Sequence, residues 1–478
     1  MKHTVIYFLI RFISGGIGLF SIYILTRILT IEEYGNFSLL IAILTFTSSI
    51  SYQWLVIATS RLIIENKQNI TPFIKAVIIL FILSSIFVSF IIFISTYIYP
   101  KITESYYLPL LFIAIILGIY NLLIHLANIV QRPFIYGGLT TIRAIFSLLT
   151  TVTLIQYFET NVISAVIGFS FGFLMSILLF IVYFNKQLMN LYSNKKNENS
   201  KQFILTLFRY GVPLSFTYLA IMIISTSDRL MLGKMSEITQ VAAYSTAYDL
   251  TQQTVGVLMS ILFLAFFPKI LNAYSEQLTD TVKLLMQKLS TLLLIICIFI
   301  SIIFLIASAG IAKIMFGEEF ISLASNIMPI IAIAVAIGGY KGYYIDIIFQ
   351  LHKRTDIQLI ITLFMAIVNI LINIILIPKY GAIGAAISTL VAFLLGSVLS
   401  WIYSRKLLFI PQKIGDNSKV FISGLIVLIF SYFITFNLTS ITGILLTLAM
   451  LSGIYFLILI SLNIFNVHAH ISKYFKGG

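Results

Sequence analysis

The sequence predicts an all-α, polytopic membrane protein of about 14 transmembrane helices, arranged as two six-helix lobes followed by two C-terminal helices. Three observations support this fold class. The chain is 60% hydrophobic, and it is only 10% charged, which is well below a soluble domain. It also contains many apolar runs of the roughly 20 residues that cross a bilayer, separated by short polar stretches.

Hydropathy windows of about 19 residues predict the helices in order along the chain. They lie at 5–29, 37–60, 73–99, 107–130, 135–157, 160–184, 209–232, 241–267, 288–312, 324–348, 357–377, 380–403, 419–437 and 441–462. The first window is interpreted as a retained helix rather than a cleaved signal, because it carries Arg11 and Arg27 and lacks a small-x-small cleavage site.

The basic residues predict the orientation of these helices, because Lys and Arg accumulate in cytoplasmic loops. With the N-terminus inside, 21 of the 30 Lys and Arg residues fall in inner loops or at the inner ends of spans, four in outer segments and five deeper within spans. The four outer ones are Lys101, Lys234, Lys313 and Lys379. This asymmetry predicts a multi-pass membrane protein with both termini cytoplasmic. It also accounts for the net charge of +14, so no nucleic-acid partner is expected.

The longest inner loop divides the first twelve helices into six and six. The predicted domains are an N-lobe at 1–184, a cytoplasmic linker at 185–208, a C-lobe at 209–403, a cytoplasmic loop at 404–418, and two helices with a cytoplasmic tail at 419–478. Arg27 and Arg229 both lie near the outer end of the first helix of a lobe. The two lobes therefore indicate a parallel internal repeat, a feature of many transporters.

The sequence lacks the motifs of several nucleotide-binding and metal-binding sites. No G-x-x-x-x-G-K-[ST] phosphate loop and no H-E-x-x-H zinc motif occur, and the five histidines show no zinc spacing. The single cysteine, Cys297, lies in an apolar run and has no partner for a disulfide. We therefore expect no cofactor, no metal and no catalytic residues, and we predict that the protein is not an enzyme.

Five basic residues lie within the predicted spans, where a charge costs about 2.5–3.5 kcal/mol and so tends to face a cavity. Arg11, Arg143 and Lys341 share a depth in the inner half of the membrane, whereas Arg27 and Arg229 lie in the outer half. Together these residues predict a substrate-binding surface for an anion that moves outward. The alternative for Arg27, Arg229 and Lys341 is that their side chains extend to the membrane interface.

Three acidic residues also lie within the spans: Asp228, Asp249 and Asp346. Asp249 recurs with Ser245, Gln252 and Gly256 at helical spacing, which places a polar stripe on one helix face. Asp249 and Asp228 are the candidates for ion coupling. The stripe can instead form a hydrogen-bonded seam between helices, and Asp228 can instead neutralise Arg229. Asp346 is expected either to pair with Lys341 or to lie at the inner rim.

Other small and polar residues in the spans predict packing rather than chemistry. Asn369 and Asn373 are expected to form hydrogen bonds between helices, and Gly168 and Gly172 to allow two helices to approach closely.

Four segments carry a resemblance to a known family. They are Thr26-Arg27-Ile28-Leu29 with Glu33-Tyr34-Gly35; Tyr210-Gly211-Val212-Pro213 with 227–233; residues 243–250 leading to Phe267-Pro268; and residues 373–389. With these segments the chain resembles the polysaccharide repeat-unit flippases of bacterial O-antigen and capsule synthesis, within the multidrug/oligosaccharidyl-lipid/polysaccharide exporter superfamily. The segments run from the first to the twelfth predicted helix, so the resemblance covers nearly the whole chain.

The resemblance implies two six-helix lobes in a V around a cationic cavity, working by alternating access. The implied substrate is an oligosaccharide on an undecaprenyl-pyrophosphate carrier, with cavity arginines on the pyrophosphate or on acidic sugars. The resemblance also implies a monomer in the lipid of the bacterial cytoplasmic (inner) membrane. Transport is expected to be driven by an ion gradient, and the partners to be a glycan polymerase and other polysaccharide-assembly proteins. The competing hypotheses are a drug or cation antiporter of the same superfamily, which needs an acidic cavity, and a membrane-embedded glycan-modifying enzyme, which needs a catalytic constellation.

Overall fold

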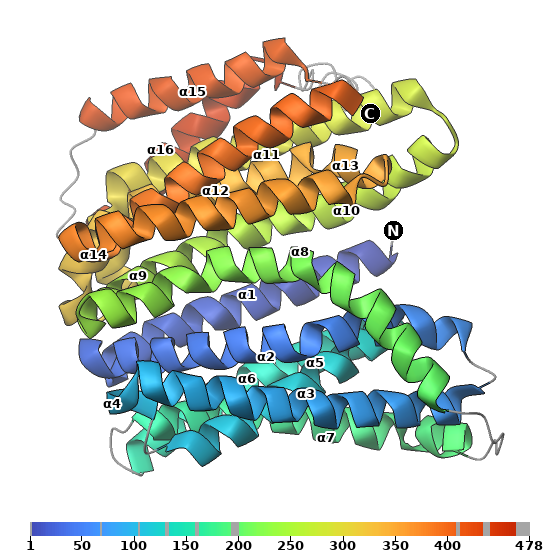
Figure 1. Ribbon diagram of the computed structural model, residues 1–478. Coiled ribbons are helices and arrows are strands. Elements are labelled where there is room, and N and C mark those ends of the chain that lie inside the picture. The colour runs from blue at the N-terminus through green and yellow to red at the C-terminus, as the bar shows by residue number, and fades with distance from the viewer. Residues whose placement is uncertain are drawn as a thin grey trace. The chain divides into compact units, whose positions relative to one another are not determined.

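The protein is helical throughout the computed structural model, which describes residues 2–66, 69–103, 106–129, 133–157, 162–192, 200–407, 412–433 and 440–464. None of these residues lies in a strand (Figure 1), so the predicted all-α fold class is confirmed. The first helices are α1 (Lys2–Ile28), α2 (Ile31–Glu65), α3 (Ile70–Ile98), α4 (Pro100–Thr103), α5 (Tyr107–Ile129), α6 (Pro133–Tyr157), α7 (Val162–Tyr192), α8 (Ser200–Met235) and α9 (Ile238–Thr251). The remaining ones are the π-helix η3 (Gln252–Gly256), α10 (Val257–Ser275), α11 (Thr279–Met315), α12 (Glu318–Tyr340), the π-helix η4 (Lys341–Ile345), α13 (Ile347–Leu351), α14 (Thr355–Leu407), α15 (Ile414–Phe433) and α16 (Ile441–Ser461).

The spans agree with the helix count that the sequence predicts. Eleven described helical segments are long and apolar enough to cross a membrane. In addition, α8 is a bent span, Phe12–Ile28 of α1 is a shorter apolar helix, and α14 contains two helices joined at Gly381. The described segments therefore correspond one for one to the 14 predicted helices.

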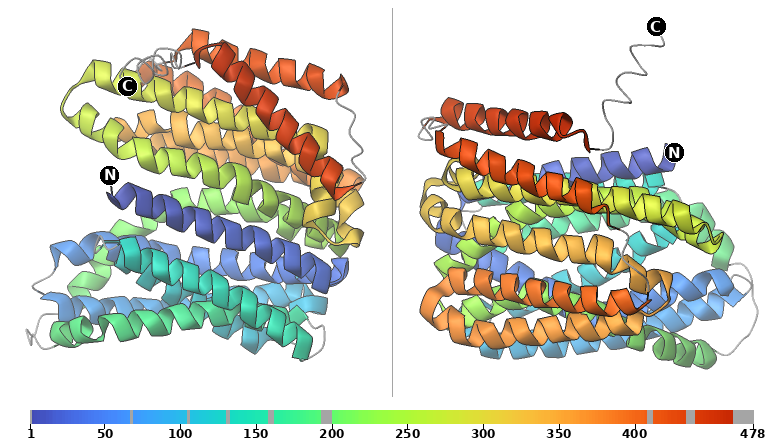
Figure 2. Two further views of the ribbon diagram at one scale, coloured as in Figure 1. Left: turned by 180° about the vertical axis from the view of Figure 1, so that it is seen from behind. Right: turned by 90° about the horizontal axis from the view of Figure 1, so that it is seen from above.

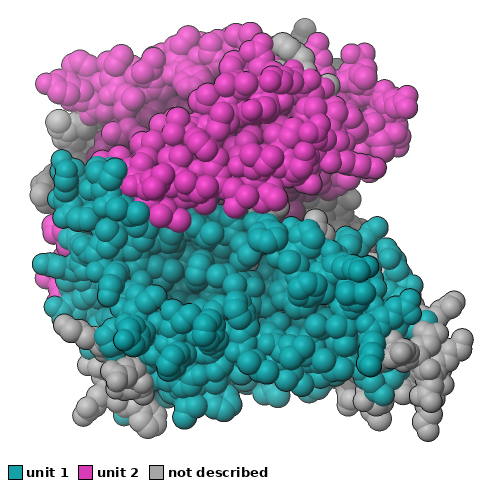
Figure 3. All heavy atoms as spheres, in the orientation of Figure 1, with its two compact units in different colours: residues 1–245, 373–381 teal, residues 246–372, 382–478 magenta. Residues whose placement is uncertain are grey.

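The chain forms two compact units, coloured separately in Figure 3. Unit 1 contains Met1–Ser245 and Asn373–Gly381, and unit 2 contains Thr246–Ile372 and Ala382–Gly478. Within each unit the long helices lie alongside one another (Figure 2). The lobe, linker and tail boundaries drawn from the sequence stay predictions.

In unit 1, helix α2 packs against α3, α5 and α8. Leu55 and Ala58 of α2 form a buried apolar cluster with Phe73 of α3 and Leu207 of α8. Gly211 lets α8 approach α2 closely, because a Cβ at this position would lie 2.3 Å from the carbonyl oxygen of Trp54. The glycine of the Tyr210-Gly211-Val212-Pro213 segment therefore has a packing role.

Helix α8 bends after Pro213. The segments Lys201–Pro213 and Tyr218–Met235 meet at an angle of 56°. Proline has no amide hydrogen to donate and its ring clashes with the preceding turn, which is the usual cause of such a bend.

The two parts of α14 form an antiparallel hairpin around Gly381. Gly381 adopts φ 54° and ψ −130°, a backbone conformation that glycine tolerates best. The Asn369 amide before the break donates to Thr389 Oγ1 after it at 3.4 Å, and Gly396 lies against the side chain of Met365. The hydrogen bond confirms the packing role predicted for Asn369.

A polar network attaches α15 to the rest of unit 2. Asn417 in its first turn accepts a hydrogen bond from Thr291 Oγ1 at 2.9 Å and donates to Ser290 Oγ at 3.3 Å, both on α11. The Ser290 hydroxyl is in turn 2.8 Å from the Tyr340 hydroxyl of α12. Hydrogen bonds of this kind hold helices together in a bilayer, where apolar burial does not distinguish protein from lipid.

Candidate functional site

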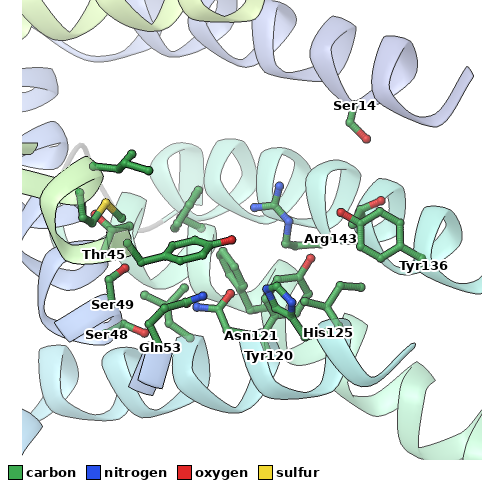
Figure 4. Close-up of a pocket in the computed structure, with 18 of the residues that line it drawn as sticks. Ser14, Thr45, Ser48, Ser49, Gln53, Tyr120, Asn121, His125, Tyr136 and Arg143 are labelled. Carbon is green, nitrogen blue, oxygen red and sulfur yellow. The ribbon is translucent and has the colours of Figure 1, made fainter. Parts of the chain in front are cut away.

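Unit 1 contains a cavity of about 600 Å³ between α1, α2, α5, α6, α7 and α8 (Figure 4). Its volume lies within the usual range for ligand sites. Twelve of its 19 described lining residues carry polar side chains, although the greater part of the lining surface is apolar. These twelve are Ser14, Thr45, Ser48, Ser49, Gln53, Tyr120, Asn121, His125, Tyr136, Thr140, Arg143 and Tyr218. Among the described lining residues none is acidic.

Arg143 of α6 supplies the permanent positive charge of this cavity. Its guanidinium carbon lies 5.0 Å from the ring centre of Phe173 and 5.8 Å from that of Tyr120. Within the described parts of the chain it forms no ion pair, and its Nε is buried without a hydrogen-bond partner. A half-buried cation held by aromatic faces rather than by a carboxylate remains available to an anionic ligand.

Two glycines of α7 position the helix that carries Arg143. A Cβ at Gly172 would lie 2.3 Å from the Arg143 carbonyl oxygen, and one at Gly168 would lie 2.4 Å from Thr151 Cα. The close approach allows Ser147 Oγ to donate to the Phe169 carbonyl at 2.7 Å. The predicted packing role of Gly168 and Gly172 is thus confirmed, and it also fixes the position of the cavity arginine.

Two polar stripes in the cavity were not predicted from the sequence. Thr45, Ser48, Ser49 and Gln53 recur at helical spacing along α2, and Tyr120, Asn121 and His125 do so along α5. Charged residues alone do not reveal either stripe, because the members of both stripes carry no permanent charge. A count of neutral polar residues at i, i+3, i+4 and i+8 in an apolar helix is the signal that finds them.

Several of these cavity groups lack a protein partner. The Ser14 and Ser48 hydroxyl oxygens are buried without a hydrogen bond among the described residues. The Gln53 side chain is 8% exposed and lines the cavity. Buried polar groups in folded proteins are normally hydrogen-bonded, so this wall is suited to a polar ligand or to water.

Arg11 and Arg27, which the sequence also predicts to bind substrate, both lie on α1. Arg11 lies three residues before Ser14, but its side chain is outside the described structure. Arg27, in the last turn, is exposed; it donates to the Tyr23 carbonyl oxygen at 2.8 Å and its guanidinium lies 3.7 Å from the Tyr23 ring centre. Whether either contacts a substrate stays a prediction.

Asp228 and Arg229 lie next to each other on α8 in different surroundings. Asp228 is completely buried and accepts hydrogen bonds from the Tyr244 hydroxyl of α9 and, at 2.6 Å, from Asn373 Nδ2 of α14. The interhelical bond predicted for Asn373 is thereby confirmed. Arg229 is half-buried. The roles of Asp228 in ion coupling and of Arg229 in substrate binding stay predictions.

The predicted stripe of Ser245, Asp249, Gln252 and Gly256 crosses a change of helix type. α9 ends at Thr251, and Gln252–Gly256 forms the π-helix η3. A π-helix contains more residues per turn than the α-helix that the spacing assumed. Asp249 lies half-buried just before this change, and its coupling role stays a prediction.

Lys341 is paired with Asp346. Lys341 Nζ lies 2.7 Å from Asp346 Oδ2, and both side chains are more than nine-tenths buried. The π-helix η4 makes this contact possible, because its hydrogen bond from Asp346 N to Lys341 O places residues five apart on the same face. A pair with Lys341 is one of the two alternatives that the sequence predicts for Asp346, and it is confirmed. A role for Lys341 in substrate binding stays a prediction.

Unit 2 contains a second, apolar cavity of about 380 Å³ between α11, α12, α14 and α15. Its described lining includes Cys297, Tyr340 and Phe421 and no charged residue. In the part of the chain that the structure describes, no group of three or more His, Cys, Asp or Glu side chains is arranged to hold a metal ion.

The sequence matches two family profiles and is similar to one other membrane protein. The sequence profile described as polysaccharide biosynthesis protein matches residues 1–273, and the profile described as MatE matches residues 213–375. The uncharacterized membrane protein MJ1068 of Methanocaldococcus jannaschii is 25% identical over 340 residues, which cover 68% of this chain and 65% of that relative.

Solved structures share the fold. The lipid II flippase MurJ in an inward closed conformation is 17% identical, with a TM-score of 0.73 over 95% of this chain and 98% of that one. A multidrug resistance transporter of the MATE family, in an inward-facing conformation, is 13% identical, with a TM-score of 0.61 over 84% and 97%. The resemblance inferred from the four sequence segments is thus confirmed at the level of the family: the chain belongs to the polysaccharide biosynthesis protein family and has the fold of the multidrug/oligosaccharidyl-lipid/polysaccharide exporter superfamily.

Proposed function

We propose that this protein is a flippase that moves an undecaprenyl-pyrophosphate-linked oligosaccharide repeat unit from the inner to the outer leaflet of the cytoplasmic membrane. The observation that carries the proposal is Arg143 in the unit 1 cavity, a cation without a carboxylate partner among the described residues. A guanidinium binds phosphate in a bidentate manner, and a charge within a membrane span is costly and tends to face a cavity or a partner of opposite charge. The surrounding neutral polar wall suits the sugar.

Transport proceeds by alternating access in this proposal. Arg11 and Arg143 engage the head group from the inside, and Arg27 and Arg229 serve the outward-facing state, while the isoprenoid tail remains in lipid. Lys341 reaches the head group only in a state in which its ion pair with Asp346 opens. The surface polysaccharide formed from the cargo, O-antigen or capsule, is completed by a glycan polymerase and other assembly proteins.

The direct test replaces Arg143 in cells that need this protein for their surface glycan. We expect Arg143→Gln to reduce surface glycan about tenfold or more, because hydrogen bonds to charged groups contribute roughly 1.5–3 kcal/mol. Arg143→Lys should retain part of the activity. The matched control is Arg405→Gln, which removes an exposed arginine that lies over Trp401. Full glycan production by Arg143→Gln, with equal protein in the membrane, would contradict the proposal.

For ion coupling we propose Asp228 and Asp249 as carriers. Support for Asp228 comes from its complete burial and from its two hydrogen-bond donors, which stabilise a carboxylate. Asp228→Asn should abolish the dependence of transport on the ion gradient, whereas Tyr244→Phe keeps the charge and should retain that dependence. The measurement is transport into proteoliposomes with and without imposed proton or sodium gradients. Unchanged ion dependence in Asp228→Asn would exclude this residue.

The proposed orientation has both termini in the cytoplasm and the protein acting as a monomer. A cysteine introduced at Lys353, between α13 and α14, should then react with a membrane-impermeant maleimide only in inside-out vesicles. A cysteine introduced at Glu237, between α8 and α9, should react in right-side-out spheroplasts and not in inside-out vesicles. Both positions are exposed, and the native Cys297 is buried. The reverse pattern would contradict the orientation.

A further inference from the structure

We propose that Gln53 of α2 and Asn121 of α5 form a sugar-reading subsite that selects an uncharged, acetamido-bearing sugar next to the pyrophosphate. This inference rests on the proposed function and adds a specificity to it. The two residues line the same cavity as Arg143 but contribute amides rather than charge. They are therefore positioned to distinguish sugars rather than to hold the phosphate.

The lining residues are distributed unevenly along the cavity. Figure 4 shows Thr45, Ser48, Ser49 and Gln53 gathered towards one end, with Asn121 beside them, while Arg143 lies farther along and Tyr136 lies towards the other end. The end that contains Gln53 presents amide and hydroxyl groups and, among the described lining residues, no ionised side chain.

The amide groups at this end form no hydrogen bond with another described residue. Gln53 is more than nine-tenths buried, and no hydrogen bond of the Gln53 or Asn121 side chain occurs among the described residues. Ser48 Oγ is likewise buried without a partner in that part of the chain. The Gln53 side chain is buried and the Asn121 side chain is half-buried, so we expect both amides to form their hydrogen bonds with whatever occupies the cavity.

The chemistry of an amide wall indicates which sugar fits. Each carboxamide offers two N–H donors and one carbonyl acceptor. An acetamido group is a trans amide whose N–H and carbonyl point in opposite directions, so one carboxamide can accept from its N–H while a second donates to its carbonyl. The single hydroxyl of a plain hexose at the same position does not extend to both. A uronic acid would bring a carboxylate to an end of the cavity where the described residues provide no second cation, and burying an unpaired charge is strongly unfavourable.

The site is built to discriminate because its own polar groups lose a partner when the wrong sugar enters. Sites that hydrogen-bond a substrate group reject analogues without it more strongly than apolar pockets reject a missing methylene. Each lost neutral hydrogen bond corresponds to roughly a tenfold change in affinity at most. The expected preference is therefore about tenfold for an acetamido sugar over the corresponding hexose.

The experiment measures binding to the full chain in lipid nanodiscs by native mass spectrometry. The four probes are undecaprenyl pyrophosphate alone and the same carrier bearing N-acetylglucosamine, glucose or glucuronic acid. We expect the acetamido carrier to bind about tenfold more tightly than the glucose carrier, and the glucuronic acid carrier to bind most weakly of the three. In Gln53→Leu/Asn121→Leu the three glycosylated carriers should bind within about twofold of one another, with binding of bare undecaprenyl pyrophosphate unchanged.

The control is Gln202→Leu, which replaces an exposed glutamine of α8 that does not line the cavity. If the double variant does not fold, Asn121→Ser keeps a small polar group and should still reduce the preference severalfold. Equal binding of all glycosylated carriers to the unchanged protein, or a preserved preference in both variants, overturns the subsite and leaves the flippase proposal standing. If none of the four probes binds, including the bare pyrophosphate carrier, the proposed function itself fails.

Discussion

At the scale of single residues, the basic side chains of Arg143 and Lys341 lie in different surroundings. Arg143 borders a polar cavity and rests against aromatic rings, whereas Lys341 is neutralised by Asp346 at 2.7 Å. A buried charge that is paired with an opposite charge needs no ligand. A charge without a carboxylate partner needs an anionic ligand or water. A basic residue within a predicted span can therefore either border a cavity or be paired with an acid. The sequence alone does not distinguish these two cases.

The Lys341–Asp346 pair makes a prediction about stability. Lys341→Met removes one partner and leaves Asp346 as a buried carboxylate, so it should destabilise the protein by about 3–5 kcal/mol. The double variant Lys341→Met/Asp346→Leu removes both charges and should recover most of that loss. Thermal unfolding in detergent, followed by size-exclusion fluorescence, measures both. Equal destabilisation of the single and double variants would show that the pair is not the cause.

At the scale of elements, glycines determine which helices approach closely. Gly172 allows α7 to reach the backbone of α6 at Arg143, and Gly35 allows α2 to approach the carbonyl oxygen of Ile238 at the start of α9. Gly211 does the same for α8 against α2. Two of these three glycines lie in the segments that carry the family resemblance, so those segments report on packing more than on cargo.

The α6–α7 contact predicts a difference between two alanine substitutions. Gly172→Ala places a Cβ 2.3 Å from the Arg143 carbonyl oxygen, so it should destabilise by about 1–3 kcal/mol and reduce transport by displacing α6. Gly138→Ala, on the α6 side, would place a Cβ with no described atom within 4 Å apart from its own helix backbone and chain neighbours, so it should be neutral or stabilising by up to about 1 kcal/mol. Unfolding temperature and surface glycan are the readouts. Equal tolerance of both would contradict the packing argument.

The sequence predicts the helices well but not their ends or their irregular turns. The second helix begins at Ile31 rather than at 37, because Thr30 and Glu33 form a capping box in which Thr30 N donates to Glu33 Oε2 at 2.9 Å. Hydropathy detects the apolar centre of a span and not its polar cap. The π-helices at 252–256 and 341–345 were also not predicted, since helical spacing was taken as 3.6 residues per turn throughout.

The candidate site could be predicted only in part. Arg143 was found because a charge in a span is rare, whereas Gln53 and Asn121 were overlooked because neutral polar residues are common in membrane helices. The grouping of α2, α5 and α6 around one cavity depends on tertiary packing, including the glycines of α7. No pattern within a single helix contains that information.

At the scale of the whole molecule, the family assignment and the cavity support one account of the cargo. The fold is shared by a lipid II flippase and by multidrug transporters, so it does not by itself choose between an anionic lipid-linked sugar and a cationic drug. The charge of the unit 1 cavity favours the first, because a cationic cargo needs an acidic group and the described lining contains Arg143 and no acid.

The most direct measurement is translocation by the purified protein in proteoliposomes. We predict that it moves an undecaprenyl-pyrophosphate-linked acetamido sugar across the bilayer, that Arg143→Gln lowers the rate about tenfold or more, and that a cationic dye is not transported. Gradient-driven transport of the dye without movement of the lipid-linked sugar would contradict the account.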